Sequence, residues 1–167
     1  MPKTILRYPL FAILICASAV AQNKKPTTPA ETVAQYFKGV NDQVLVMAKD
    51  FPEDKYDFRL KPEMRSFGDV IVHIASGNVY AAKAGRGEKV KWDELDPKDY
   101  KGKAKIVALL EKSIQDSNAT LKASPVGPDK NLEPWMGVME HSAEHYGLLI
   151  AYYRANGIVP PSSRPQK

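Results

Sequence analysis

The chain is almost devoid of cysteine. It holds one among 167 residues, Cys16, and this residue lies in an apolar stretch near the N-terminus that we expect to be removed. The mature protein would then carry no thiol. That excludes disulfide bonds, cysteine nucleophiles, and zinc or iron–sulfur sites with cysteine ligands.

Long hydrophobic runs are also scarce. The run at residues 10–20 is too short to span a bilayer as a helix, and Lys3 and Arg7 precede it. Together with the small-x-small motif Ala19-Val20-Ala21, this arrangement is typical of a signal peptide over residues 1–21. We expect export to the periplasm or medium, cleavage near Ala21, and no stable membrane span afterwards. An uncleaved anchor is the alternative.

A strong charge of one sign is missing as well. The formal net charge of the full chain is +5, and loss of the two basic residues Lys3 and Arg7, with no acidic residue before Gln22, would lower it to +3. The remaining lysines have acidic neighbours and form no basic stripe with interleaved aromatic residues. The sequence therefore indicates a mildly basic solvated surface and no nucleic-acid partner.

No segment alternates apolar and polar residues with a period of two between hairpin turns, so we expect no sheet. Four segments show helical periodicity instead: 29–49, 66–84, 102–122 and 134–155. The sequence predicts an all-α protein, a single four-helix bundle over residues 29–163, with long first-to-second and second-to-third connections. A linker, 22–28, would precede the bundle, and a C-terminal tail, 164–167, would follow it.

Several helix ends are marked by local signals. Thr28-Pro29-Ala30-Glu31 and Ser66-Phe67-Gly68-Asp69 are capping signatures for the first and second helices. Asn156-Gly157 is a C-terminal stop for the fourth. The connection at residues 88–101 carries Trp92 and other bulky residues, and we expect it to pack across one end of the domain.

Histidine is scarce too, and the positions of the three histidines are informative. His141 and His145 are four residues apart in the fourth helical segment, so their side chains share one face. His73 lies in the second segment. If these helices pack side by side, three neutral imidazoles can converge on one divalent metal and leave coordination positions open for water or substrate. Ordinary core histidines are the alternative, and the spacing alone leaves both open.

Glu144 is the candidate catalytic residue, because it lies one position from the His141 and His145 ridge. It could assist a ligand, bind the metal itself, or be a surface charge. Residues 141–145 also match the H-x-x-E-H pattern of inverted zinc proteases. Those enzymes need a further acidic ligand downstream, and no Asp or Glu follows Glu144, which disfavours this reading.

Three more residues fall near the predicted site. Tyr80 lies two turns beyond His73, and Tyr152 lies two turns beyond His145. Either tyrosine could line a pocket mouth or belong to the core. Gly77, one turn beyond His73, could leave room for a ligand or allow close helix packing.

Four stretches of the sequence carry a family resemblance: 51–59, 65–75, 140–147 and 156–163. Through them the chain resembles the DinB-like (DinB/YfiT) family of four-helix-bundle metalloenzymes, exported members in particular, over about Pro29 to Ser163. The resemblance implies a helix order that is not simply up and down. It also implies a metal held by His73, His141 and His145. Zinc and nickel are the usual ions, and the ligand type would also allow iron or copper.

The resemblance leaves two main functions open. Relatives include thiol-dependent transferases, in which a metal stabilises the reactive thiolate. The first function is therefore a metal-dependent enzyme, transferase-like or hydrolase-like, acting on a small-molecule substrate or thiol. The second is a non-catalytic periplasmic metal- or ligand-binding module, which suits the export signal. A purely structural bundle is the third possibility. Exposed apolar helix faces could also support a homodimer.

Overall fold

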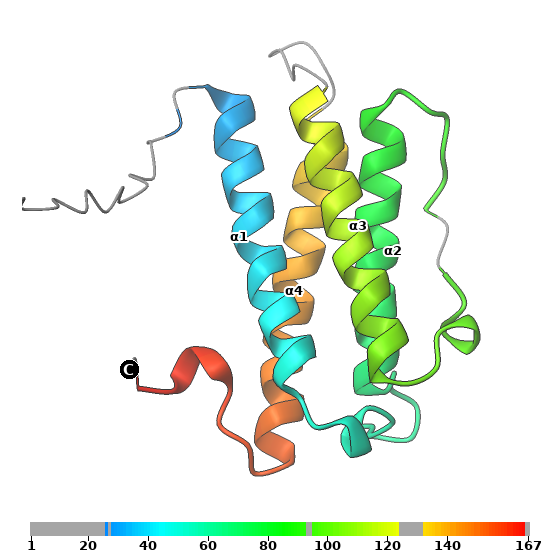
Figure 1. Ribbon diagram of the computed structural model, residues 1–167, viewed down its shortest axis with the longest axis vertical. Coiled ribbons are helices and arrows are strands. Elements are labelled where there is room, and N and C mark those ends of the chain that lie inside the picture. The colour runs from blue at the N-terminus through cyan, green and yellow to red at the C-terminus, as the bar shows by residue number, and fades with distance from the viewer. Residues whose placement is uncertain (1–25, 27, 93–94, 124–131, 166–167) are drawn as a thin grey trace, which may run out of the picture.

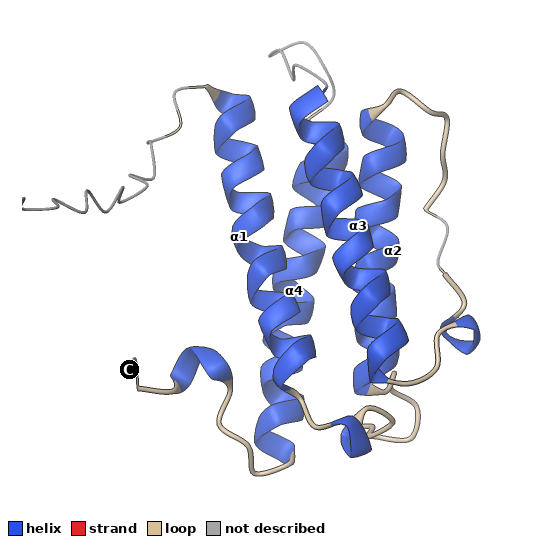
Figure 2. Cartoon of the chain, viewed as in Figure 1, coloured by secondary structure: helices blue, strands red, loops and turns tan. Residues whose placement is uncertain are grey.

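The computed structural model describes residues 26, 28–92, 95–123 and 132–165, and these residues form a bundle of four α-helices (Figure 1). No strand occurs in these ranges; a single bridge joins Arg59 to Ser66 (Figure 2). The predicted all-α four-helix fold is therefore confirmed. The helices are α1 (Pro29–Asp50), α2 (Phe67–Gly85), α3 (Lys103–Ala123) and α4 (Glu133–Ala155), with short 3₁₀ turns η1 (Glu53–Lys55), η2 (Pro97–Asp99) and η3 (Pro161–Ser163).

The helix ends follow the local signals in the sequence. Thr28 and Glu31 form a reciprocal capping box at the start of α1, and Ser66 and Asp69 form one at the start of α2. At the end of α4, Gly157 adopts a φ of 69°, and the amide of the next residue bonds back to the carbonyl of Tyr153 at 3.0 Å. These bonds satisfy backbone groups that the helix itself leaves unpaired.

The helix order is not simply up and down. In Figure 1, α1 and α4 run in one direction and α2 and α3 in the other, so α2 and α3 are parallel neighbours. α2 packs against α3 and α4, and α1 packs against the same two helices. This order agrees with the family resemblance, and it makes α2 and α4 adjacent.

The connection between α2 and α3 corrects one expectation. It runs back along the length of α2 (Figure 1) and does not pack only across one end of the domain. Two parallel helices require this path, because the chain must return from the end of α2 to the level at which α3 begins. Leu95 is fastened to α2 by a 2.9 Å hydrogen bond from its amide to Ser76 Oγ.

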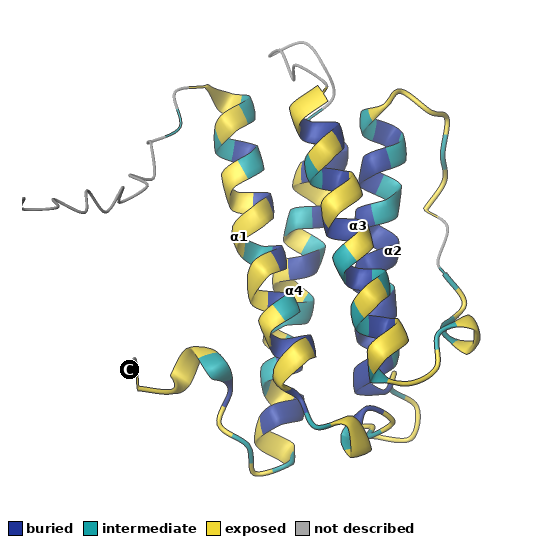
Figure 3. Cartoon of the chain, viewed as in Figure 1, coloured by how far each residue is buried: buried dark blue, intermediate teal, exposed yellow. Residues whose placement is uncertain are grey.

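The core divides into two apolar clusters along the bundle, and buried residues face inward on all four helices (Figure 3). In the larger cluster, the rings of Phe51 and Phe67 stack with centroids 3.9 Å apart, and Tyr153 packs against both. In the smaller cluster, Phe37 meets Trp135 edge to face at 5.4 Å. No helix in the described part of the chain is long and apolar enough to cross a membrane.

Candidate metal centre

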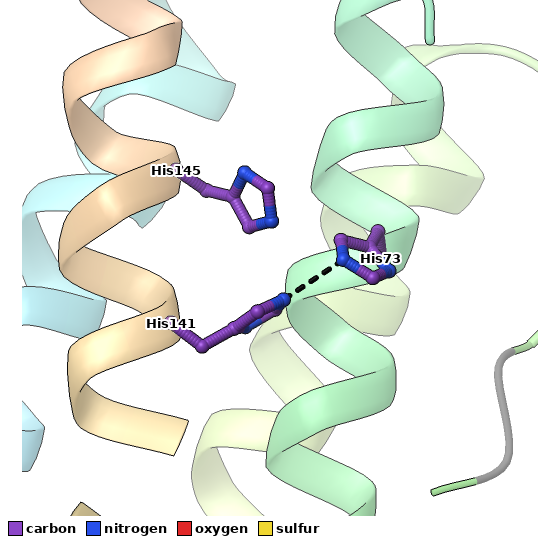
Figure 4. Close-up of side chains that lie close together, drawn as sticks. All are labelled: His73, His141 and His145. Atoms are coloured by element: carbon purple, nitrogen blue, oxygen red, sulfur yellow. Dashed lines mark hydrogen bonds between the residues drawn. The ribbon is translucent and has the colours of Figure 1, made fainter. Parts of the chain in front are cut away.

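The three histidines lie together between α2 and α4. His73 is on α2, while His141 and His145 are one turn apart on α4, and all three rings point toward one another (Figure 4). The Nε2 atoms of His73 and His141 are 2.8 Å apart. The ring of His145 lies 4.8 Å from that of His73 and 4.4 Å from that of His141, centroid to centroid.

The cluster fits a divalent ion. One ring nitrogen from each histidine lies within 4.8 Å of the other two. A tetrahedral ion holding nitrogens at about 2.0–2.1 Å would separate them by about 3.3 Å. Movements of the ring nitrogens by less than about 1.5 Å therefore suffice to reach that spacing. All three side chains are half-buried, so the cluster can exclude bulk water while remaining accessible to a small ligand.

The amino-acid sequence carries a family signature across the same region. A sequence model of the DinB superfamily matches residues 36–152, which include all three histidines. The chain belongs to the DinB superfamily. A search of the curated proteins found no match to it. Family membership and the histidine cluster together fit a metal-binding DinB protein.

One side of the cluster in this DinB protein is covered by Trp92, from the connection between α2 and α3. The indole centroid lies 5.0 Å from the ring of His141 and 6.1 Å from that of His73. The indole rests where α2 has no side chain: a Cβ on Gly77 would lie 2.7 Å from Trp92 Cη2. The missing side chain at Gly77 thus makes room for an aromatic residue of the protein itself.

Sequence reasoning placed Trp92 in the connection but missed its position at the site. The useful signal in the sequence is Gly77, whose missing side chain predicts free space one turn beyond His73. Tyr80 extends the aromatic surface, since its ring packs on Trp92 with centroids 5.3 Å apart.

Tyr152 does not join the site. It is fully buried, and its hydroxyl donates to the backbone carbonyl of Arg65. Its ring packs edge to face on Phe67 with centroids 5.9 Å apart. Burial raises the pKa of Tyr152, which keeps the hydroxyl protonated as a donor. Tyr152 is therefore a core residue.

The structure places Glu144 on the exposed surface of α4, next to His145 in sequence. Its catalytic role therefore stays a prediction. Glu140 is exposed too. Ser142, between the two α4 histidines, is fully buried, in line with a packing role.

Proposed function

We propose that this DinB protein binds a divalent metal ion through His73, His141 and His145 and uses it to activate a small-molecule substrate. The observation that carries the proposal is the convergence of all three histidines from two helices, with ligand atoms within 4.8 Å of one another. Three protein ligands leave room for a water or substrate on the same ion, as in catalytic sites.

Each residue of the site has a physical part in this proposal. His73 and the α4 pair come from helices that pack against each other, so the ligand set is held by the bundle. Trp92 shields one side of the rings from water. When bound there, a divalent ion would lower the pKa of a thiol or water that reached it.

The residues favour thiol chemistry over hydrolysis. Metal-assisted hydrolysis needs a positioned general base, and the predicted candidate, Glu144, lies on the exposed surface. Thiol transfer needs no such base, because a metal that lowers the pKa of the thiol lets it lose its proton to solvent and react as the thiolate. We therefore propose a thiol-dependent transferase as the first reaction class and hydrolysis as the second. Zinc and nickel are the proposed ions, and iron or copper would also suit imidazole ligands.

We also propose that the protein is exported from the cytosol. Residues 1–21 have the pattern of a signal peptide, and they lie outside the described residues. Export would remove the protein from most cytosolic thiols. This supports an alternative in which the same histidines serve a non-catalytic periplasmic module that binds a metal or ligand.

Metal analysis of protein purified without a histidine tag tests the site. We expect about one equivalent of a divalent metal in the wild type and in the exposed control Glu140→Gln. His73→Ala, His141→Ala and the triple histidine variant should lose it while far-UV circular dichroism still shows a folded bundle. Unchanged metal content in the folded triple variant would overturn the proposal.

Activity assays separate the two functions. The metal-loaded protein would be tested with thiols plus electrophilic acceptors, and with esters and lactams. Turnover that disappears in His141→Ala would support the enzyme. Stoichiometric metal without turnover of any of these substrates would support the binding module.

A further inference from the structure

A small hollow lies between the C-terminal half of α2 and the connection that follows it, farther along α2 than His73. Its volume is about 320 Å³, enough for a carboxylate or phosphate group with part of its carrier. Three lysines line it, together with three apolar or aromatic residues: Lys83, Lys89, Lys91, Val79, Tyr80 and Val90.

The hollow gathers positive charge, and none of the described residues that line it is a carboxylate. None of the three lysines forms an ion pair with another residue of the described part of the chain. The nearby Glu88 is paired with Arg86 at 2.7 Å. Like charges held together repel one another, and a bound anion relieves that repulsion.

The backbone holds these lysines in place. After Gly87, which has a φ of 82°, the amide of Glu88 bonds back to the carbonyl of Lys83 at 3.2 Å. This turn brings the start of the connection against the last turn of α2, so Lys89 and Lys91 face the same hollow as Lys83.

Aromatic side chains join the hollow to the histidine cluster. Tyr80 lines the hollow and packs on Trp92, and Trp92 in turn packs on His141. Along α2, Tyr80 lies about 10 Å and Lys83 about 15 Å beyond His73 at a rise of about 1.5 Å per residue. One elongated molecule could therefore reach both places.

We propose that the lysine hollow binds the anionic end, a carboxylate or phosphate, of the molecule whose other end meets the histidine cluster. The inference rests on the proposed function for the reacting end. It assigns the substrate class as an elongated small acid, and under thiol chemistry as a thiol acid. Tyr80 and Trp92 would contact its apolar middle.

The anion site is tested first in metal-free protein, by calorimetric titration with citrate and with inorganic pyrophosphate. Lys83→Gln/Lys89→Gln/Lys91→Gln should weaken binding about tenfold, the scale expected for a few exposed ion pairs. The matched control Lys98→Gln/Lys101→Gln/Lys105→Gln removes the same charge from exposed positions elsewhere and should bind like the wild type. The two titrants separate a preference for carboxylate from one for phosphate.

Three results would overturn the anion site: equal weakening in both triple variants, no effect in either, or no binding by the wild type. Asp93 and Glu94 follow Trp92 in sequence and lie outside the described residues. Binding that appears only after Asp93→Asn/Glu94→Gln would also overturn it, because the native hollow would then be neutralised by its own chain.

Whether one molecule reaches both the lysine hollow and the histidine cluster is tested in cobalt-loaded protein. The readout is the thiolate-to-cobalt absorption band. Mercapto acids of increasing chain length would be compared with mercapto alcohols of equal length. The acid should bind better than the alcohol only when its carbon chain spans about 10–15 Å. This preference for the acid should vanish in Lys83→Gln/Lys89→Gln/Lys91→Gln. Thiol binding without any acid preference would refute the hollow and leave the metal site standing. Failure to bind cobalt would refute the metal site, while the titration in metal-free protein would still decide the hollow.

Discussion

Two glycines of α2 show how a missing side chain positions an aromatic ring. Gly77 accommodates Trp92 at the histidine cluster, and Gly85 accommodates Trp135 in the smaller core cluster. The Trp92 ring can move into solvent more easily than the Trp135 ring, because Trp92 is 40% exposed and Trp135 is 1% exposed. The same substitution should therefore have different effects at the two glycines.

Gly77→Ala should displace Trp92 without destabilising the bundle. The new Cβ would meet the far end of the Trp92 ring at 2.7 Å, and this side chain can move into solvent. Alanine also favours helix by up to about 1 kcal/mol over glycine. We expect stronger acrylamide quenching of tryptophan fluorescence, with unfolding free energy unchanged or slightly raised. Gly137→Ala, where a Cβ meets nothing within 4 Å, is the control and should leave quenching as in the wild type. Unchanged quenching in Gly77→Ala would contradict the placement of Trp92.

Gly85→Ala should destabilise the fold. Its Cβ would clash with Trp135 Cζ2, and the buried indole is already packed against Phe37. Overpacking of this kind costs about 1–3 kcal/mol. Urea denaturation would measure the loss against Gly137→Ala. Equal stability of the two variants would show that the smaller core cluster is looser than the structure indicates.

At the scale of elements, different faces of α2 contact different parts of the bundle. His73 and Gly77 face α4 and the site. Asn78 faces the opposite side, where its Nδ2 donates to Asn41 Oδ1 on α1 at 2.9 Å and to Ser113 Oγ on α3 at 3.3 Å. These directional bonds between buried groups favour one rotation of α2 about its axis, which helps orient His73 toward α4.

The segment after α4 is fastened to the end of α1 by a charged pair. Arg164 donates from Nη1 and Nη2 to the two carboxylate oxygens of Asp50 at 2.7 and 2.6 Å. This guanidinium holds the pKa of Asp50 below its usual 3.8. Tyr153 adds a hydrogen bond to the same carboxylate at 3.1 Å.

The Asp50–Arg164 pair predicts a pH-dependent stability. Because the folded-state pKa of Asp50 is lowered, its contribution is fully present above the unfolded-state pKa and is lost as pH falls through the lower folded-state pKa. The Tm gap between wild type and Arg164→Ala should therefore shrink as pH falls from about 6 to about 3. Thermal melts across this range measure it.

Lys112→Ala is the matched control for this pair. It breaks the exposed Lys112–Asp116 contact and should change the Tm little at any pH. If the Tm difference between wild type and Arg164→Ala stayed constant down to the lowest pH, Asp50 would not be the group responsible.

For the whole molecule, a metal would link α2 to α4 and so stabilise the bundle. A ligand that binds only the folded state at a hundred times its Kd adds about 2.7 kcal/mol. For a domain of this size that is a rise in Tm on the order of 5–10 °C. We expect this rise when zinc is added to chelator-treated protein, measured by scanning calorimetry.

Two variants serve as comparisons for the zinc-induced rise in Tm. His73→Ala keeps the α4 pair but removes the ligand from α2, so it should lose most of the rise, whereas Glu140→Gln should retain it. An equal rise in His73→Ala would show that the metal does not bridge the two helices.

The sequence predictions succeeded where the interacting residues lie close together in the chain. The capping boxes at Thr28 and Ser66 and the stop at Gly157 involve residues only a few positions apart, so their helix ends were predictable. The convergence of the histidines was predicted only on the condition that the second and fourth helices pack together. The position of Trp92 was missed, because it depends on how a long connection lies against a helix fifteen residues earlier in the chain.

The amino-acid sequence alone specifies four helices, most of their ends, and the placement of His141 and His145 on one face, because backbone hydrogen bonds and helical periodicity act locally. Tertiary packing placed α2 beside α4, returned the connection along α2, put Trp92 against His141 and gathered three lysines around one hollow. Those arrangements arise from packing between segments far apart in the chain, and no local pattern encodes them.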